Sequence, residues 1–369
     1  MGKKLRVSIC MIIVSVLAVT NTVLVLPVQA GLTPVSQEPE TRDVMFLNIF
    51  SPRTGLGDSS DHYMAEQGDI SAQNRLAAMY WYAGNYTRAQ YWDRRAAVQG
   101  DALAQGNLGW MYQNGLGVTQ NFEQAVYWYK RAAEQDDAFA QTNLGLMYQD
   151  GLGITQNYEQ AVYWYRRAAE QDDAFAQGNL GWMYAHGLGI TQNYEQAVYW
   201  YRRAADQDNA YAQANLGLMY QDGLGITQDY EQAVYWYRRS AEQGNAYAQV
   251  NLGWVYQYGL GTMQDYEQAA YWYRKATEQG DGIAQNNLGL LYQQGLGVTQ
   301  NYEQAAYWYR RAAEQGYAMA QNNLGSLFLE GLGVEQSYEQ ASYWLRKAYD
   351  QGEPHAQDNV AKLPAEYRW

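Results

Sequence analysis

Apolar positions along most of the chain follow two alternating helical stripes. In the stretch 102–113 the apolar residues sit at i, i+4, i+7 and i+8: Ala104, Leu108, Met111 and Tyr112. A second stripe has the spacing i, i+3, i+4, i+7 and i+8: Ala125, Trp128, Tyr129, Ala132 and Ala133. Both spacings describe one face of an α-helix. They predict a helix over about 102–113 and a second from Asn121 to about Gln135, which Asn121 and Gln124 open with a capping-box-like start.

This two-helix pattern recurs every 36 residues. Leu-Gly pairs stand at 108–109, 144–145, 180–181, 216–217, 252–253, 288–289 and 324–325. Seven full units therefore occupy 101–352, and a shorter unit at 61–100 precedes them without their Gly-Leu-Gly turn. Residues 353–369 continue the register and are expected to form a C-terminal capping helix and tail. A fixed period of this length predicts an all-α stack of helix pairs, in which each pair buries its stripe against its neighbours.

The first 30 residues have a different pattern. A basic start (Lys3, Lys4 and Arg6) leads into an apolar run and ends at Val28-Gln29-Ala30. This order predicts a secretory signal peptide cleaved after Ala30, with an uncleaved membrane anchor as the alternative. We expect an exported protein, periplasmic or secreted, or one in the endoplasmic reticulum lumen or outside the cell in a eukaryotic host. No membrane insertion is expected after cleavage.

Residues 31–60 are expected to form a flexible leader, since they contain Pro34, Pro39 and Pro52. Within the leader, the apolar run VMFLNIF at 44–50 is expected to cap the first helix pair. Binding of a partner and disorder are the alternatives for this run.

Charge narrows the classes of partner. The chain has a net charge of −13, and cleavage of a segment with three basic and no acidic residues gives −13 − 3 = −16. This charge argues against nucleic acid and anionic membranes as partners. The only cysteine, Cys10, lies in the signal segment, so the mature chain has no disulfide, thiol nucleophile or thiolate metal site.

Other chemistry is sparse in the mature chain. His62, His186 and His355 are too far apart in a solenoid to share a metal ion or a substrate. The acidic pair Asp136-Asp137 and its equivalents are expected to cap the following helix, with calcium binding as the alternative. The Gly-Leu-Gly turn lacks the further residues of a phosphate loop and is expected to serve the corner, with Gly115 as helix C-cap. We therefore expect no catalytic residue, cofactor or metal.

One unit reads AQGNLGWMYQNGLGVTQNFEQAVYWYKRAAEQ at 104–135. It closely resembles the Sel-1-like repeat family, relatives of the tetratricopeptide repeats, and the resemblance covers about 70–356. The resemblance implies a right-handed α-solenoid that binds proteins or peptides and scaffolds complexes. Bacterial members are often exported and are linked to envelope function and host interaction. A cysteine-rich branch is associated with β-lactam hydrolysis, but the mature chain here has no cysteine.

Residues off the apolar stripe of the first helix are expected to line a concave groove. One set is a ladder of amides: Asn107, Asn143, Asn179, Asn215, Asn251, Asn287 and Asn323. The other set is aromatic: Trp110, Trp182, Trp254, Phe139, Phe175, Tyr211 and Tyr247. An amide can both donate to and accept from an extended peptide, and large aromatic side chains supply apolar contact energy. The alternatives are that each Asn satisfies a neighbouring helix end and that the tryptophans pack between units.

The sequence thus predicts a monomeric, non-catalytic scaffold that binds a protein or extended peptide of unknown identity. A β-lactam-interacting hydrolase and a peptidoglycan- or glycan-binding envelope protein are the alternatives. On the second helix, Tyr127 and its equivalents lie off the stripe between Glu123 and Arg131. We expect these tyrosines to pack under arginine stems, with a second contact surface as the alternative.

Overall fold

The computed structural model describes residues 59–369, so the signal segment, nearly all of the leader and the run 44–50 lie outside the described residues. The described part contains eighteen α-helices, one short 3-10 helix and no strand. A single helix, α2 (Ser59–Glu66), opens it. The first helices of the units are α3 (Ile70–Tyr82), α5 (Ala102–Asn114), α7 (Ala138–Asp150), α9 (Ala174–His186), α11 (Ala210–Asp222), α13 (Ala246–Tyr258), α15 (Gly282–Gln294) and α17 (Ala318–Glu330).

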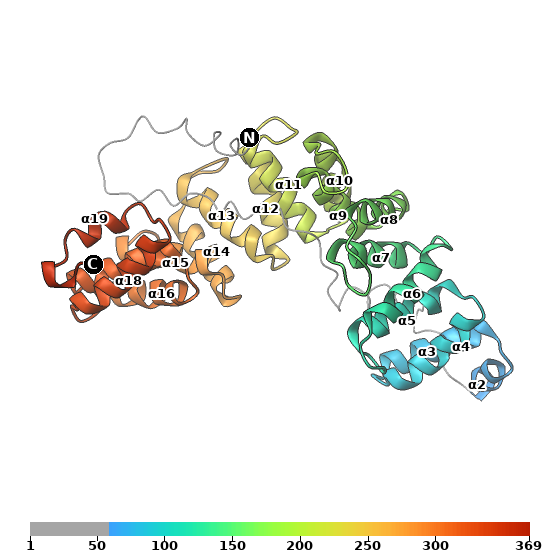
Figure 1. The fold of residues 1–369 in the computed structure, drawn as a ribbon. Coiled ribbons are helices and arrows are strands. Elements are labelled where there is room, and N and C mark those ends of the chain that lie inside the picture. The colour runs from blue at the N-terminus through green and yellow to red at the C-terminus, as the bar shows by residue number, and fades with distance from the viewer. Residues whose placement is uncertain (1–58) are drawn as a thin grey trace, which may run out of the picture.

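The second helices are α4 (Tyr86–Val98), α6 (Phe122–Ala133), α8 (Tyr158–Glu170), α10 (Tyr194–Asp206), α12 (Tyr230–Glu242), α14 (Tyr266–Glu278), α16 (Tyr302–Glu314) and α18 (Tyr338–Asp350). The chain ends with α19 (Ala356–Val360) and η1 (Ala365–Tyr367). Each helix packs on the next one in the chain, so the units follow one another from α2 at one end to α19 at the other (Figure 1). The predicted all-α solenoid with a 36-residue step is confirmed.

Local signals fix where the helices begin and end. The Asn121 side chain accepts a hydrogen bond from the Gln124 backbone N–H at 2.9 Å, and Asp101 accepts one from Ala104 at 2.8 Å. Both contacts satisfy a backbone donor that a helix start leaves free. Gly115 ends α5 with a φ of +69°, in the left-handed region that glycine adopts at little cost. The predicted cap roles of Asn121 and Gly115 are confirmed.

The second glycine of the turn serves the contact between units. Gly117 has a φ of +68°, and a Cβ added there would lie 2.4 Å from the backbone oxygen of Tyr86 in the preceding unit. Only a residue without a side chain permits this approach of turn to helix. The Gly-Leu-Gly stretch is therefore a stacking element of the solenoid.

A chain of glutamines ties the units together. Gln105 is fully buried; its Nε2 donates to the Ala97 carbonyl of the preceding unit at 3.0 Å, and its Oε1 accepts from Gln135 of its own unit at 2.8 Å. One side chain thus joins α4, α5 and the turn that follows α6, and it satisfies a helix-end carbonyl. The Gln-to-Gln bond recurs with Gln99–Gln73, Gln171–Gln141, Gln207–Gln177, Gln243–Gln213, Gln279–Gln249, Gln315–Gln285 and Gln351–Gln321.

The C-terminal segment folds back on the last helix pair. Leu363 is fully buried beside α17 and α18. The Ser342 hydroxyl donates to the Tyr367 carbonyl at 2.6 Å, and the Arg346 guanidinium lies 5.7 Å from the centre of the Trp369 ring. The tail therefore covers the end of the stack.

Candidate interaction surfaces

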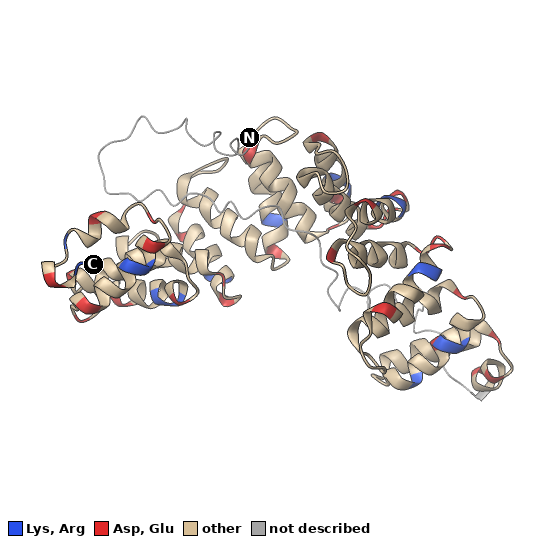
Figure 2. Ribbon diagram, in the orientation of Figure 1, with Lys and Arg blue, Asp and Glu red and all other residues tan. Residues whose placement is uncertain are grey.

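Charge divides the two kinds of helix. In the seven full units no first helix contains Lys or Arg, and acidic residues occur in them only at the last positions of α7, α11 and α17. Every Lys and Arg of these units lies on a second helix, for example on α16 and α18 (Figure 2). The side of the solenoid formed by first helices, here the first-helix surface, is therefore almost uncharged.

The asparagine ladder lies beneath that surface. Six of the seven asparagines of the expected ladder are at most 3% exposed, and the seventh, Asn323, is half-buried. The six are Asn107, Asn143, Asn179, Asn215, Asn251 and Asn287. Asn143 and Asn251 donate to carbonyls one turn earlier in their own helices, at 2.9 and 2.8 Å. Asn107 donates to the Asp93 carboxylate of the preceding unit at 2.9 Å. This corrects the expectation that these amides are displayed, because stacking of the next unit covers the face on which they lie.

The expected aromatic residues divide into two groups. Trp110 and Phe139 are buried, with their rings edge to face at 6.0 Å across the boundary between two units. For these two residues the alternative interpretation is the right one: they pack between units and do not line a groove. The other five are half-buried and keep part of their rings at the surface: Trp182, Trp254, Phe175, Tyr211 and Tyr247.

Two of these rings have aromatic neighbours one helical turn away. Trp182 lies 4.6 Å from the ring of His186, and Trp254 lies 5.5 Å from the ring of Tyr258. These pairs are tilted toward each other and present apolar area together with a polar edge.

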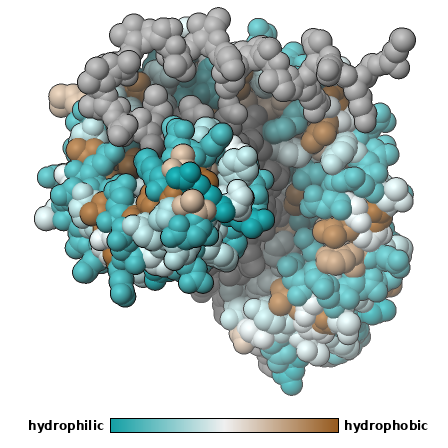
Figure 3. Space-filling view, turned by 60° about the vertical axis from the view of Figure 1, so that its left-hand side comes forward, coloured by the Kyte–Doolittle hydropathy of each residue, from teal (hydrophilic) through white to brown (hydrophobic). Residues whose placement is uncertain are grey.

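The second helices present a regular ladder of half-exposed tyrosines, 45–50% exposed, at Tyr91, Tyr127, Tyr163, Tyr199, Tyr235, Tyr271, Tyr307 and Tyr343. Each packs edge to face on the tryptophan that follows it, as Tyr127 does on Trp128 at 4.9 Å. The Arg131 guanidinium lies 5.8 and 5.7 Å from the centres of these two rings. The predicted packing under arginine stems is confirmed, while about half of each tyrosine stays open. In the space-filling view, hydrophobic residues form separate small patches among hydrophilic ones (Figure 3).

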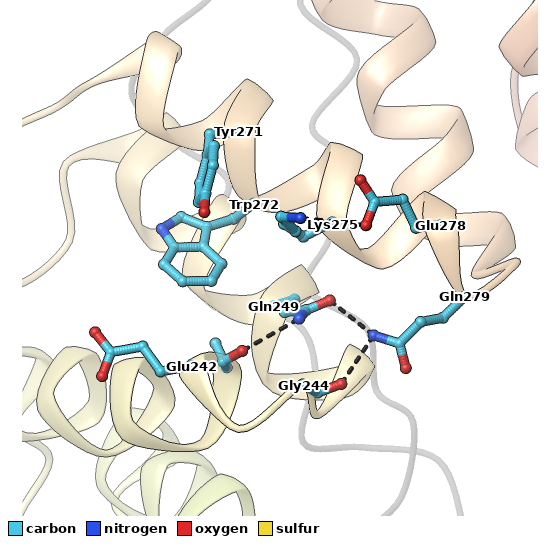
Figure 4. A pocket seen from close by; sticks show the side chains of 9 residues that line it. Glu242, Gly244, Gln249, Tyr271, Trp272, Lys275, Glu278 and Gln279 are labelled. Carbon is cyan, nitrogen blue, oxygen red and sulfur yellow. Dashed lines mark hydrogen bonds and ion pairs between the residues drawn. The ribbon is translucent and has the colours of Figure 1, made fainter.

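A pocket lies beside this ladder where one unit meets the next. At the boundary between α12 and α14 it has a volume of about 410 Å³ and is lined by Glu242, Gly244, Gln249, Tyr271, Lys275 and Gln279, among others (Figure 4). Gln279 Nε2 donates to Gln249 and to the Gly244 carbonyl, at 3.0 and 2.8 Å. Lys275 turns toward Glu278, with its Nζ 3.3 Å from a carboxylate oxygen. Corresponding residues line a pocket near Tyr91 and another near Arg239.

Three boundaries in the middle of the solenoid place an acidic residue in this pocket. Arg167, Arg203 and Arg239 form ion pairs with carboxylates of the preceding inter-unit turn, Asp136, Asp172 and Asp208. These aspartates have positive φ values of 61–66°, where the other inter-unit turns have glycine. A backbone with positive φ favours glycine, yet these three turns have an aspartate there, which brings a carboxylate to the boundary. Sequence reasoning assigned the pairs to capping, which holds for Asp137 and Asp173 but not for the residue before each.

Residues 59–369 contain no group of three or more His, Cys, Asp or Glu side chains that could hold a metal ion. No helix among them is long and apolar enough to cross a membrane. Burial raises the pKa of the Tyr165, Tyr201 and Tyr237 hydroxyls, which keeps these core groups protonated.

The repeated helix pair is also found in known proteins. The profile of the Sel1 repeat matches nine segments: 55–83, 70–101, 102–137, 138–173, 174–209, 210–245, 246–281, 282–317 and 318–353. A Sel1 repeat protein from Oxalobacter formigenes is 31% identical, with 87% of this chain and 93% of that chain covered and a TM-score of 0.61. The protein c5321, a protective antigen present in uropathogenic Escherichia coli strains, is 31% identical over 88% of this chain and 87% of that chain, with a TM-score of 0.48.

The comparison with curated proteins found no match. The repeat profile nevertheless covers nearly all of the described helices, and its segment boundaries follow the 36-residue step from 102 to 353. The glycines, the capping residues and the Tyr-Trp pairs that form the solenoid all fall within these segments. The chain therefore belongs to the Sel1 repeat family.

Proposed function

We propose that this protein is an exported, non-catalytic scaffold that binds a protein or an extended peptide on its first-helix surface. Sel1 repeat solenoids are generally protein-interaction scaffolds. The observation that carries the proposal is the set of half-buried aromatic side chains on a face without basic residues, from Phe175 to Trp254. Rigid aromatic rings on a fixed backbone contribute contact area at low conformational cost.

The uncharged character of this face indicates the kind of partner. A strongly charged segment would leave its charges without counterparts there, at a cost in desolvation. A neutral, apolar-rich polypeptide segment fits the surface better, with Trp182 and Trp254 as its anchors. These two tryptophans stand on α9 and α13, two units apart, so one extended segment can contact both.

Affinity capture with a double variant tests the proposal. Trp182→Ala with Trp254→Ala is expected to reduce recovery of a partner from the native envelope or host lysate by at least about tenfold, the loss of one or two hot-spot side chains. Tyr199→Ala with Tyr235→Ala, on the second helices, is the matched control and should leave recovery unchanged. Equal recovery with both variants, at unchanged helicity, would refute the role of the first-helix surface. Recovery by isolated cell wall instead of protein would assign the surface to glycan.

Export is supported by the signal-like segment at 1–30. Expression of the full chain followed by mass spectrometry of the product tests it. The expected product begins at Gly31 and is found outside the cytoplasm. A product that keeps residues 1–30 in the membrane fraction would support the anchor instead.

A further inference from the structure

The three aspartate-containing boundaries show what the inter-unit pocket holds. At each of them the turn carboxylate pairs with an arginine of the next second helix. It also accepts a hydrogen bond from the buried glutamine of the next first helix, as Asp208 does from Gln213 Nε2 at 3.3 Å. The pairs Asp136–Gln141 and Asp172–Gln177 repeat this contact at 3.3 and 3.2 Å. The pocket is thus a two-donor site for a carboxylate that the chain itself supplies.

At the boundary between α14 and α16 the same donors are present without that carboxylate. Gly280 occupies the position of Asp208, and a Cβ built on Gly280 meets no atom within 4 Å. Arg311, equivalent to Arg239, is held by a 3.3 Å bond to the Tyr307 hydroxyl and forms no ion pair with the described residues. Gln285, equivalent to Gln213, is fully buried, and its Nε2 has no hydrogen-bond partner in the described structure.

We propose that the boundary at Gly280 is a binding site for a carboxylate of a partner polypeptide, which takes the place that Asp208 occupies two units earlier. Arg311 supplies the charge and Gln285 a second donor, and Tyr307 positions the guanidinium. A buried amide N–H without a partner costs free energy, and a carboxylate that accepts from it recovers that cost. Arginine beside an aromatic ring is well suited to planar recognition of a carboxylate.

The other glycine-containing boundaries lack one of these features. At Gly244 the cation is Lys275, which pairs with Glu278, and Gln249 Nε2 already donates to the Ala241 carbonyl at 3.1 Å (Figure 4). At Gly100 the equivalent glutamine, Gln105, donates to the Ala97 carbonyl. Gln213 makes the same bond to the Ala205 carbonyl while it donates to Asp208, so the Gly100 boundary differs from the Gly280 boundary in that its glutamine amide already has one acceptor. The Gly280 boundary combines an arginine without a carboxylate and a glutamine amide without an acceptor.

The acidic neighbour of the site does not prevent this binding. Glu314 of α16 is equivalent to Glu242, which lines the pocket where Asp208 and Arg239 pair. Since that ion pair forms beside Glu242, a carboxylate can also reach Arg311 beside Glu314. The site lies on the second helices and does not depend on the proposed role of the first-helix surface.

A nuclear magnetic resonance titration of the mature chain with ¹⁵N-labelled arginine tests the site. The probes are N-acetyl-aspartate amide, with a side-chain carboxylate, and N-acetyl-alanine, with a terminal one; N-acetyl-asparagine amide is the neutral control. We expect a saturable shift of the Arg311 Nε–Hε resonance, assigned with Arg311→Gln, with one or both acids and not with the amide. The acid that binds more tightly identifies the source of the carboxylate.

Two exchanges of turn residues make the outcome decisive. Gly280→Asp supplies the carboxylate in the chain and should weaken the response of Arg311 by at least about tenfold. Asp208→Gly opens the equivalent site and should make the Arg239 resonance respond, whereas no response of Arg239 is expected in the unchanged protein, in which Asp208 occupies the site. An Arg311 resonance that ignores both acids, responds equally to the neutral amide, or responds as before in Gly280→Asp would overturn the proposal. Failure here would leave the capture experiment on Trp182 and Trp254 unaffected.

Discussion

Gly109 of α5 lies directly against the ring of Tyr129 of α6: a methyl group added at Gly109 would stand 2.4 Å from Tyr129 Cδ1. The ring has little room to yield, because Tyr129 is fully buried and its hydroxyl donates to Gln113 Oε1 at 2.7 Å. Equivalent glycine–tyrosine contacts recur in the next units, for example Gly181 with Tyr201. The close approach of the two helices within a unit therefore requires glycine at this position.

Gly109→Ala is accordingly expected to destabilise its unit by about 1–3 kcal/mol, the usual cost of overpacking a filled core. Hydrogen exchange of the α5 and α6 amides measures the effect where it arises. Gly106→Ala is the matched control, since a Cβ there meets its nearest atom at an ordinary 3.5 Å. Equivalent positions already hold Thr142, Ala214 and Val250. The control should be neutral or slightly stabilising through helix propensity, and equal destabilisation by both changes would contradict the explanation.

The glutamine chain predicts a second sensitive position. Gln177 is fully buried, donates to the Ala169 carbonyl at 3.2 Å and accepts from Gln207 at 2.9 Å. Gln177→Leu leaves both of these groups without their partner, and we expect a loss of about 1–3 kcal/mol in the unfolding free energy. Urea unfolding followed by circular dichroism measures this loss.

Gln160→Leu is the control for that change, because Gln160 is exposed at the start of α8. Its effect should stay within about 0.5 kcal/mol. If Gln177→Leu were as mild as Gln160→Leu, the bonds between glutamines would not contribute to the stability of the stack.

The sequence predicted the helices well because their signals are local. The apolar stripes, Asn121 at a helix start and Gly115 at a helix end act within one unit, so one copy of the pattern is enough to recognise them. The residues that line the groove were harder to predict, because a helical wheel describes one helix alone and not the units packed against it. It places Asn143 opposite the apolar stripe, whereas stacking of the next unit buries Asn143 completely. The neighbouring Thr142 hydroxyl donates to Asp173 of the next unit at 3.1 Å, which shows what covers it.

The residues that make the contacts between units recur in the sequence, but their recurrence does not show which residues contact one another. Gln105 and Gln135 have counterparts in every full unit, but recurrence marks a position and not its partner. Those partners stand 30 residues apart in the chain and meet only when α5 and α6 are packed. The change from Asp208 to Gly244 in the inter-unit turn is likewise visible in the sequence, and its meaning emerges only with Arg239 opposite.

The exposed ion pairs of the inter-unit turns are expected to contribute little to stability, so that replacement of Asp172 by glycine should cost less than replacement by alanine. Asp172 pairs with Arg203, but its side chain is 70% exposed, so the pair contributes about 0–1 kcal/mol. Asp172 also has a φ of +65°, which glycine tolerates and alanine does not. Asp172→Gly should therefore change the unfolding free energy by less than about 1 kcal/mol. Asp172→Ala should lower it by about 1–2 kcal/mol. Urea unfolding orders the three proteins, and a larger loss with glycine than with alanine would contradict this account.

Asp173 predicts a pH dependence of stability. Burial raises the pKa of this helix-capping carboxyl to about 6, although the Ala176 and Phe175 backbone N–H groups and the Thr142 hydroxyl favour its charged form and lower the pKa. The folded protein therefore holds the proton more tightly than the unfolded chain, whose pKa lies near 3.8. Stability should fall as the pH rises from about 4 to 6 and stay reduced above it, by at most about 3 kcal/mol.

Asp173→Asn isolates this contribution. The neutral amide oxygen can still accept from the Ala176 N–H, as Asn209 does from Ala212 at 2.9 Å. The variant should match the unchanged protein near pH 4 and exceed it in unfolding free energy above about pH 6, in urea titrations across this range. The reciprocal change, Asn209→Asp, places a carboxyl at a position that is 7% exposed and should introduce the same fall with rising pH. If Asp173→Asn were less stable at pH 7, the charge of Asp173 would be favourable in the cap, and the penalty from burial would be smaller than the contribution of its hydrogen bonds.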